Sequence, residues 1–448
     1  MKITTIISTF LILTFVLYTS KANENSFSLE EAQNFAIENS IQQKNAALDF
    51  KITQKQSLEV ISEGFPQINA EASYQNFLKL PVSLIPLEFI GGPEGEFQEI
   101  QFGLPHNVNA NITVSQLIFD FRYFVGIRAN KALMESAKTQ LYQNEIDLKK
   151  AIEESYYAAL ASLETVEILE NNLEIINKTL HETEQLLKSG FAEQLDVDRL
   201  KLSQSNVNTQ FKNAERQAKL ALAVLKYQMG YPVQDEIILT ENLSDLIENS
   251  LLTDMEYDYQ NRIEFRLLNL QRDLRTFDIS QTRAGYFPSL YAFGTYNYDA
   301  QRNEFNFFDS NETWFESGFV GLQLRIPIFD GLTRRFMVQQ RQLDLMKINN
   351  QIQNFDELVR LEVQNARTEL ENAFENYQTQ LKNLELAERI YNVTVRKYQE
   401  GVGSSLEVSN AESDWSQTQA NYIQSMYQVI ISRTQLKHSM GLYNTNNN

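Results

Sequence analysis

The sequence predicts a mixed α/β membrane protein in which each of two similar halves joins a pair of amphipathic strands to a very long helical hairpin. Two observations carry this expectation. Phe121–Lys188 and Thr333–Glu400 lack proline and contain one glycine between them, and at 1.5 Å per residue each would form a helix about 100 Å long. Strict alternation of apolar and polar residues, which is typical of strands, precedes both stretches.

Residues 1–22 form a predicted signal peptide. An apolar run, Ile6–Leu17, follows Met1-Lys2 and precedes Ser20-Lys21-Ala22, which fits a small-x-small cleavage site. A membrane anchor is the alternative, but the apolar run is shorter than the roughly 20 residues that a spanning helix needs. We therefore expect an exported protein.

The composition argues against several classes of function. The chain has no cysteine, which excludes disulfides, thiol catalysis and a lipidated N-terminal cysteine. Its net charge of −19 makes nucleic acid a poor candidate partner. The histidines His106, His181 and His438 are scattered without metal-ligand spacing, and no Ser–His–Asp arrangement is visible. We expect no enzyme activity, no cofactor and no bound metal.

The first predicted repeat spans residues 23–230. A helix begins at the capping box Ser28-Leu29-Glu30-Glu31, and the strand pair, residues 66–119, follows it. One face of these strands carries apolar or small residues and the other is wholly polar, with Leu78–His106, a predicted long loop with four prolines, between them. The helical hairpin, residues 121–229, comes last, and its heptad spacing predicts lengthwise packing against other helices.

The second predicted repeat follows an equatorial linker and has the same order of elements. The expected ranges are 231–259 for the linker, 260–441 for the repeat, 288–329 for its strand pair, 332–440 for its hairpin and 442–448 for a C-terminal tail. Short motifs recur at an offset of 211 residues: Gly190 and Gly401, and Met229-Gly230 and Met440-Gly441. An internal duplication explains this agreement better than chance.

The number of strands requires more than one copy of the chain. Four strands cannot close a membrane barrel, because the smallest barrels have about eight. An open edge in lipid leaves backbone groups unpaired, at a cost of several kcal/mol each. Two copies would give eight strands and a filled interior, whereas three would give twelve and enclose a channel.

The chain resembles the TolC family of outer-membrane efflux proteins over essentially its whole mature length. The motifs that carry the resemblance are the strand entries at Phe65 and Phe287, Ser115-Gln116-Leu117-Ile118-Phe119-Asp120, Ile326-Pro327-Ile328-Phe329-Asp330-Gly331, and the turns Gly190…Leu195-Asp196-Val197 and Gly401-Val402-Gly403…Leu406-Glu407-Val408. Each motif is weak alone, but their order and spacing together are specific.

This resemblance implies a homotrimer with a twelve-stranded transmembrane β-barrel, four strands from each chain, continued by a long periplasmic α-helical barrel. It implies a passive channel in the outer membrane of a Gram-negative bacterium, in contact with outer-membrane lipid. The channel would receive substrate from an inner-membrane pump of the RND, ABC or MFS type, through a periplasmic adaptor, for efflux or type I secretion.

The resemblance also places the two helical turns at the periplasmic tip, where the adaptor docks. The expected docking residues are Gly190, Phe191, Ala192, Gly401, Val402 and Gly403. Helix capping alone also explains a glycine at these positions. Adaptor contact would explain, in addition, an exposed side chain at Phe191 or Val402.

A constriction of the periplasmic entrance is expected from Asp196, Glu407 and Tyr398. Tyr398 matches the family position that helps to hold the entrance shut, by a bond to Asp196. The alternative for both acids is charge–dipole stabilisation at a helix N-terminus. This chain departs from the family pattern at two positions. Gly403 stands where the family can have an arginine that latches the entrance, and Asn410 stands where it can have a second acid.

A coiled-coil structural or adhesive protein of the periplasm or cell surface is the alternative function. Such a scaffold needs no strands with a consistently apolar face, each leading into a long helix.

Gly91-Gly92-Pro93-Glu94-Gly95 follows no expected strand and opens no helix, so a phosphate-binding loop is not expected.

Overall fold

The computed structural model describes residues 25–248 and 256–443, so the predicted signal peptide, 1–22, lies outside the described residues. The chain folds into two units, each assembled from separate stretches of sequence. The strand unit comprises residues 51–136 and 269–350. The helical unit comprises the described residues up to 50, from 137 to 268 and from 351 onward. The predicted mixed α/β class is confirmed.

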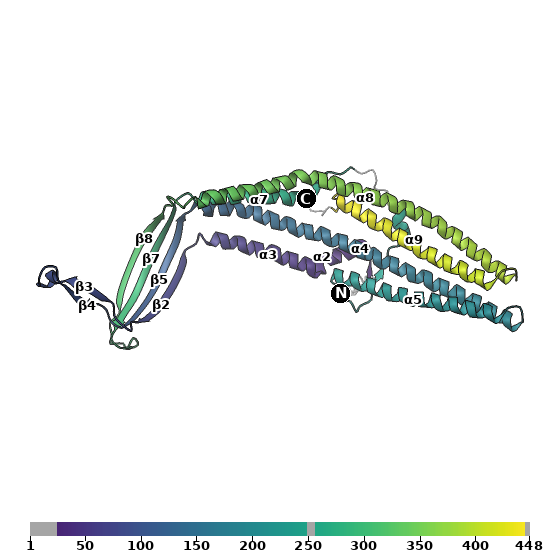
Figure 1. Ribbon diagram of the computed structural model, residues 1–448, viewed down its shortest axis with the longest axis horizontal. Coiled ribbons are helices and arrows are strands. Elements are labelled where there is room, and N and C mark those ends of the chain that lie inside the picture. The colour runs from purple at the N-terminus through teal and green to yellow at the C-terminus, as the bar shows by residue number, and fades with distance from the viewer. Residues whose placement is uncertain (1–24, 249–255, 444–448) are drawn as a thin grey trace, which may run out of the picture. The chain divides into compact units, whose positions relative to one another are not determined.

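The strand unit is built on a four-stranded antiparallel sheet (Figure 1). The strands, in order across the sheet, are β2 (Gln67–Asn76), β5 (His106–Phe119), β7 (Ser289–Arg302) and β8 (Phe315–Arg325). The pairing of β5 with β7 joins the first half of the chain to the second. β2 and β8 are the edge strands of this sheet.

The register of the sheet sorts its side chains into two faces, because successive residues of a strand point to opposite sides. One face is apolar, and one level of it carries Ile68, Val114, Gly294 and Val320. The other face is mostly polar, and its next level carries Asn69, Thr113, Thr295 and Phe319. On the polar face the hydroxyls of Thr113 and Thr295 lie 3.1 Å apart, which links β5 to β7 by side chains as well as backbone. The sheet is therefore amphipathic across its width.

The expectation of a long loop at Leu78–His106 was wrong in part. The segment contains a β-hairpin, β3 (Val82–Pro86) paired with β4 (Phe97–Gln101), and a single 3₁₀ turn, η1 (Leu87–Ile90). Pro86 closes a two-stranded ribbon, where a missing N–H is tolerated. Pro81 and Pro86 thus stand at the ends of β3 and Gly91–Gly95 in the turn, whereas Gly103 and Pro105 lie between β4 and β5.

The first helix of the strand unit packs beside the start of the long helix. The Tyr123 hydroxyl of α4 (Phe121–Lys188) donates to the Ile61 carbonyl of α3 (Ile41–Ser62) at 3.0 Å. Asp120, between β5 and α4, accepts hydrogen bonds from the backbone N–H and the guanidinium of Arg122. The second half repeats this order, with α7 (Ile263–Ala284) before β7 and the start of α8 (Thr333–Gln399) after β8.

The helical unit contains two antiparallel helical hairpins (Figure 1). α4 pairs with α5 (Gln194–Met229), and α8 pairs with α9 (Ser405–Ser439). The remaining elements are α2 (Leu29–Asn39), the parallel strands β1 (Ser26–Phe27) and β6 (Ile238–Leu239), α6 (Leu243–Glu248) and the 3₁₀ turn η2 (Tyr259–Asn261). Within the described ranges, no helix combines the length and apolarity that membrane crossing requires.

Apolar seams hold the helical unit together. Ile176, Leu180 and Thr183 of α4, which follow one another at the steps of four and three residues that a heptad requires, are buried. Tyr156 is buried, and its hydroxyl donates to the Phe27 carbonyl at 2.8 Å, which ties the first described residues to α4. In the predicted tail, the Tyr443 hydroxyl donates to the buried carboxylate of Glu153 at 2.7 Å. The rest of that tail, 444–448, lies outside the described residues.

Candidate functional site

The turn between α4 and α5 ends the first hairpin with a left-handed glycine. Gly190 has a φ of 78°, and the Phe191 N–H donates to the Leu186 carbonyl at 2.9 Å, a Schellman-type C-cap. Glu193 is the N-cap residue of α5, and the Asp196 carboxylate accepts a hydrogen bond from its backbone N–H at 3.0 Å. Asp196 therefore belongs to a capping box at the start of the return helix.

The turn between α8 and α9 has the same construction. Gly401 also has a φ of 78°, and the Val402 N–H donates to the Lys397 carbonyl at 3.0 Å. Ser404 caps α9 in a capping box with Glu407, which accepts from the Ser404 N–H at 3.4 Å. A Cβ at Gly403 would stand 3.0 Å from the Tyr398 backbone nitrogen, so a latching arginine at this position would crowd the turn.

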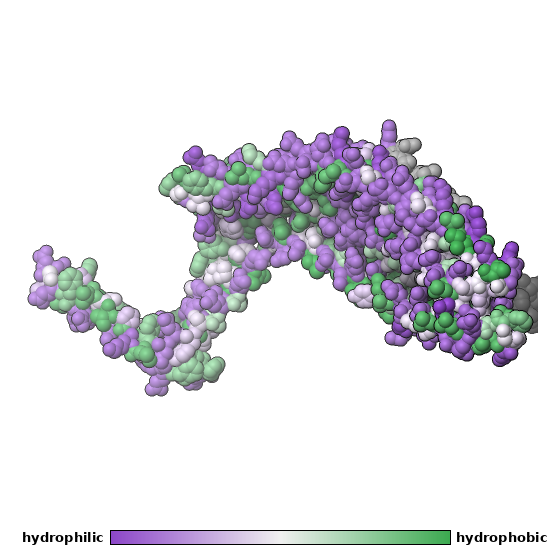
Figure 2. All heavy atoms as spheres, turned by 45° about the vertical axis from the view of Figure 1, so that its right-hand side comes forward, coloured by the Kyte–Doolittle hydropathy of each residue, from purple (hydrophilic) through white to green (hydrophobic). Residues whose placement is uncertain are grey.

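Both turns present apolar side chains to solvent. Phe191 is 83% exposed and Val402 is 75% exposed. Figure 2 shows apolar surface, in green, among polar surface at the end of the helical unit. Because a Cβ at Gly190 or Gly401 would meet no atom within 4 Å, the backbone of each turn is open on that side.

The bond predicted between Tyr398 and Asp196 is absent from the described residues. The Asp196 carboxylate instead accepts a hydrogen bond from the hydroxyl of Ser405, at 2.6 Å. The Tyr398 hydroxyl is buried beside Thr183 and has no hydrogen-bond partner in the described chain. Burial raises the pKa of Tyr398, and the negative charge of Asp196 adds to the shift. Asp196 thus bridges α5 to α9 rather than to α8.

A second bridge of the same kind lies seven residues further along both helices. The Ser203 hydroxyl of α5 donates to the Glu412 carboxylate of α9 at 2.7 Å. In each bridge the two residues are 209 positions apart, and the acid comes from α5 in one and from α9 in the other. We call Asp196–Ser405 and Ser203–Glu412 the carboxylate–serine bridges. They hold the return helices α5 and α9 together near the turns.

Glu412 is buried in an apolar part of this seam, where Tyr391 and Trp415 stack with ring centroids 4.9 Å apart. Burial raises the pKa of its carboxyl, and the Ser203 hydrogen bond offsets part of that shift. Sequence reasoning missed Ser203, Ser405 and Glu412. The available signal was a polar residue recurring at intervals of seven within an otherwise apolar seam.

The structure does not bring together all of the residues predicted for the constriction. Asp196 and Glu407 each cap their own return helix, and no contact joins them in the described chain. Tyr398 packs against the apolar cluster of the seam. Ala192 follows Phe191 in the first turn, and its side chain is half-buried. Among residues 25–248 and 256–443, no group of acidic or histidine side chains could hold a metal ion.

Comparison with known proteins finds sequence similarity in the second half of the chain. Residues 259–442 match the sequence profile of the family described as outer membrane efflux protein. The second half of the chain is therefore similar in sequence to the outer membrane efflux proteins. No curated protein sequence matches the chain.

Solved structures of such channels share its fold. CusC, from a study of folding and transmembrane channel formation, matches with a TM-score of 0.69 at 15% identity, over 92% of this chain and 91% of that one. The CmeC outer membrane channel of Campylobacter jejuni matches with a TM-score of 0.68 at 14% identity, over 92% and 85%. The open MtrE channel of Neisseria gonorrhoeae matches with a TM-score of 0.67 at 16% identity, over 92% and 88%.

Proposed function

We propose that the protein is a homotrimeric channel of the bacterial outer membrane that passively conducts substrates from an inner-membrane pump and a periplasmic adaptor to the exterior. The observation that carries this proposal is the four-stranded sheet with one apolar face, one polar face and two free edges. In a barrel wall, the apolar face meets lipid and the polar face meets water. A structural coiled-coil protein gives no reason for this arrangement.

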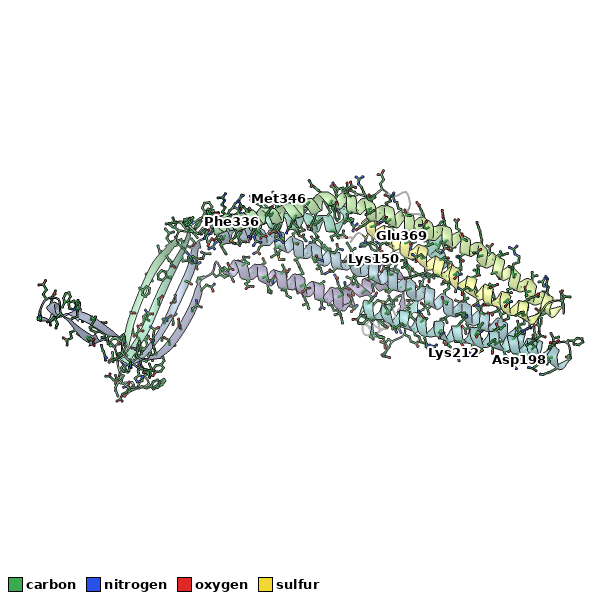
Figure 3. The ribbon with its side chains drawn as sticks, in the orientation of Figure 1. Lys150, Asp198, Lys212, Phe336, Met346 and Glu369 are labelled. Atoms are coloured by element: carbon green, nitrogen blue, oxygen red, sulfur yellow. The ribbon has the colours of Figure 1, made fainter. Side chains whose placement is uncertain are left out.

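Apolar side chains beside the edge strands support pairing with further copies. α3 precedes edge strand β2 and exposes Ile52 and Leu58, and α8 follows edge strand β8 and exposes Phe336, Leu343 and Met346. Figure 3 shows Phe336 and Met346 on this first part of α8. Each edge of the strand unit thus has both unpaired backbone and exposed apolar side chains. Three copies, rather than two, would enclose an open channel of twelve strands.

The two turns are the proposed docking site for the adaptor. Exposed apolar side chains at a helical tip favour a protein partner, and the open backbone at Gly190 and Gly401 allows close approach. An inner-membrane pump of the RND, ABC or MFS type would deliver the substrate. The neighbouring structures are described as outer membrane channels, which supports the channel and leaves the pump class open.

Asp196, Glu407 and Tyr398 are the proposed constriction, with Ser405 added as the partner of Asp196. Three copies would bring six carboxylates to the entrance, where like charges favour cations. Asp196→Ala with Glu407→Ala should therefore lower the cation preference in a planar bilayer, and it should raise single-channel conductance because like charges no longer crowd a narrow ring. An unchanged conductance and cation preference would leave helix capping as the role of both acids.

Membrane fractionation and a mass measurement in detergent test the proposed assembly. We expect the protein in the outer-membrane fraction, with a protein mass of three chains per particle. A monodisperse soluble monomer would overturn the proposal.

A further inference from the structure

The polar face of the sheet carries an aromatic pair that a purely water-lined wall does not need. Phe293 of β7 and Phe319 of β8 lie on this face with ring centroids 6.1 Å apart and planes at 83°. On β2 and β5, the corresponding positions of the polar face hold amides, hydroxyls and one carboxylate. Phe319 is 53% exposed, so the pair is accessible from the polar side.

The backbone opposite the pair makes room for it. Gly321 pairs with Phe293 across the two strands, and a Cβ at Gly321 would stand 2.8 Å from the Phe293 ring. Any larger residue at this position would push the Phe293 ring from the wall. The edge-to-face contact with Phe319 then fixes the ring.

Neither lipid nor a neighbouring copy covers this pair in the proposed trimer. Lipid would contact the opposite face, which carries Val320 beside Phe319. A neighbouring strand would pair with the backbone edge of β8, and its side chains would extend the same polar face rather than cover it. The rings would therefore contact whatever passes through the channel.

The carboxylates on the same face lie further along the wall than the rings, since Asp299 is four residues beyond Thr295, the residue that pairs with Phe319. Asp299 of β7 lies opposite Phe315 of β8, and the Phe315 side chain is 61% exposed. The Asp299 carboxylate accepts a hydrogen bond from the Asn109 amide. Glu71 of β2 is the other carboxylate on this face. Arg325, at the opposite end of β8, is the only basic side chain on the polar face of the four described strands. Rings and carboxylates together favour an organic cation.

We propose that Phe293 and Phe319, with Asp299 and Glu71, form a transit site for cations with an aromatic or apolar body. This inference rests on the proposed trimeric channel. The rings contact the apolar body of such a cation, and the carboxylates attract its positive charge. The cation therefore stays longer in the channel, although no closed pocket holds it. Inorganic cations would be attracted by the carboxylates alone, because they have no apolar body for the rings to contact.

Current noise from trimers in planar bilayers tests the site, because brief residence of a solute in a wide channel adds noise. Benzyltrimethylammonium combines a ring with a positive charge, tetramethylammonium lacks the ring, and benzenesulfonate reverses the charge. We expect excess noise from benzyltrimethylammonium alone. Phe293→Ser with Phe319→Ser should shorten its residence time about threefold or more, and Asp299→Asn with Glu71→Gln should shorten it as well.

Matched variants keep the test decisive. Thr295→Ser, on the same face, should leave the residence time unchanged, and Phe319→Tyr should retain most of it. Equal residence times in the wild type and the double serine variant, with normal trimers and conductance, would overturn the transit site and leave the channel intact. A failure to form conducting trimers in the wild type would instead contradict the proposed function.

Discussion

The sheet of the strand unit and the turn region of the helical unit organise their polar groups in different ways. In the sheet, polarity alternates residue by residue, and each side chain reaches its face through the local geometry of one strand. Near the turns, polarity depends on single pairs, such as Ser203 and Glu412, that are 209 positions apart and meet only because α5 packs against α9. A change in the sheet should therefore affect assembly, and a change near the turns should affect docking or gating.

The largest effect is expected on the apolar face of the sheet. Ile112→Arg should cost about 2–4 kcal/mol if this residue lies near the middle of the bilayer, because it places a charge in lipid. Its neighbour Asn111, on the polar face, provides the control, since Asn111→Arg would point into water. The fraction of assembled protein recovered from outer membranes measures both. Equal losses would remove the distinction between the faces.

A smaller effect is expected at the apolar stripe beside β8. Phe336 is exposed in the single chain, and its burial against a second copy would contribute roughly 2 kcal/mol. Phe336→Asp should therefore lower the temperature at which trimers dissociate, measured by electrophoresis after stepwise heating. Phe336→Leu, which keeps an apolar side chain at the same position, is the control. Similar curves for both variants would place this stripe outside the interface.

At the turns we expect loss of docking without loss of assembly. Phe191→Asp and Val402→Asp should each weaken crosslinking to the adaptor about tenfold, equivalent to about 1.4 kcal/mol, because a charge replaces an apolar contact. Trimer content should stay normal. Leu220→Asp alters another exposed apolar residue, on α5 and far from the turn, and should have little effect. Unchanged crosslinking in both turn variants would exclude the tip as the docking site.

The smallest effect concerns the buried carboxyl of Glu412. Its folded-state pKa is raised by burial, so ionisation disfavours the packed seam. Stability should be highest below the unfolded pKa near 4.5 and should fall as pH rises through the interval up to the raised folded pKa. Glu412→Gln should flatten this part of the profile and add about 1 kcal/mol at neutral pH. Thermal unfolding of the trimer between pH 4 and 8 measures it.

A matched variant separates charge from hydrogen bonding at this position. Ser203→Ala removes the hydroxyl that donates to Glu412 and should steepen the fall in stability with rising pH. If Glu412→Gln shows the same pH profile as the wild type, this carboxyl does not contribute to the pH dependence of the seam.

The same contrast explains what the sequence could predict. The alternation of residues such as Ile112 and Asn111, and the long helices without proline, are local signals, so strands and helices could be expected from them. The β3–β4 hairpin was missed because Pro86 and its neighbouring glycines suggested a loop, although these residues lie at strand ends and in the turn.

The partner of Asp196 could not be predicted from local pattern. The choice between Tyr398 and Ser405 depends on the rotation of α5 against α8 and α9, which heptad spacing alone leaves open. The sequence placed Asp196 and Glu407 at the starts of the return helices, where charge–dipole stabilisation was the alternative role, and the structure has both acids in capping boxes. Local pattern therefore predicted where each return helix begins, and packing decided which helices Asp196 joins.

Disulfide crosslinking between the edge strands tests the closed sheet most directly, because the chain contains no cysteine of its own. Asn69→Cys, Glu71→Cys and Ser73→Cys in β2 would each be combined with Ser317→Cys in β8, since these residues share the polar face. We predict that at least one pair links chains into a covalent trimer, with no larger product. Products limited to monomers in every combination, or a ladder extending beyond three chains, would contradict a barrel closed by three copies.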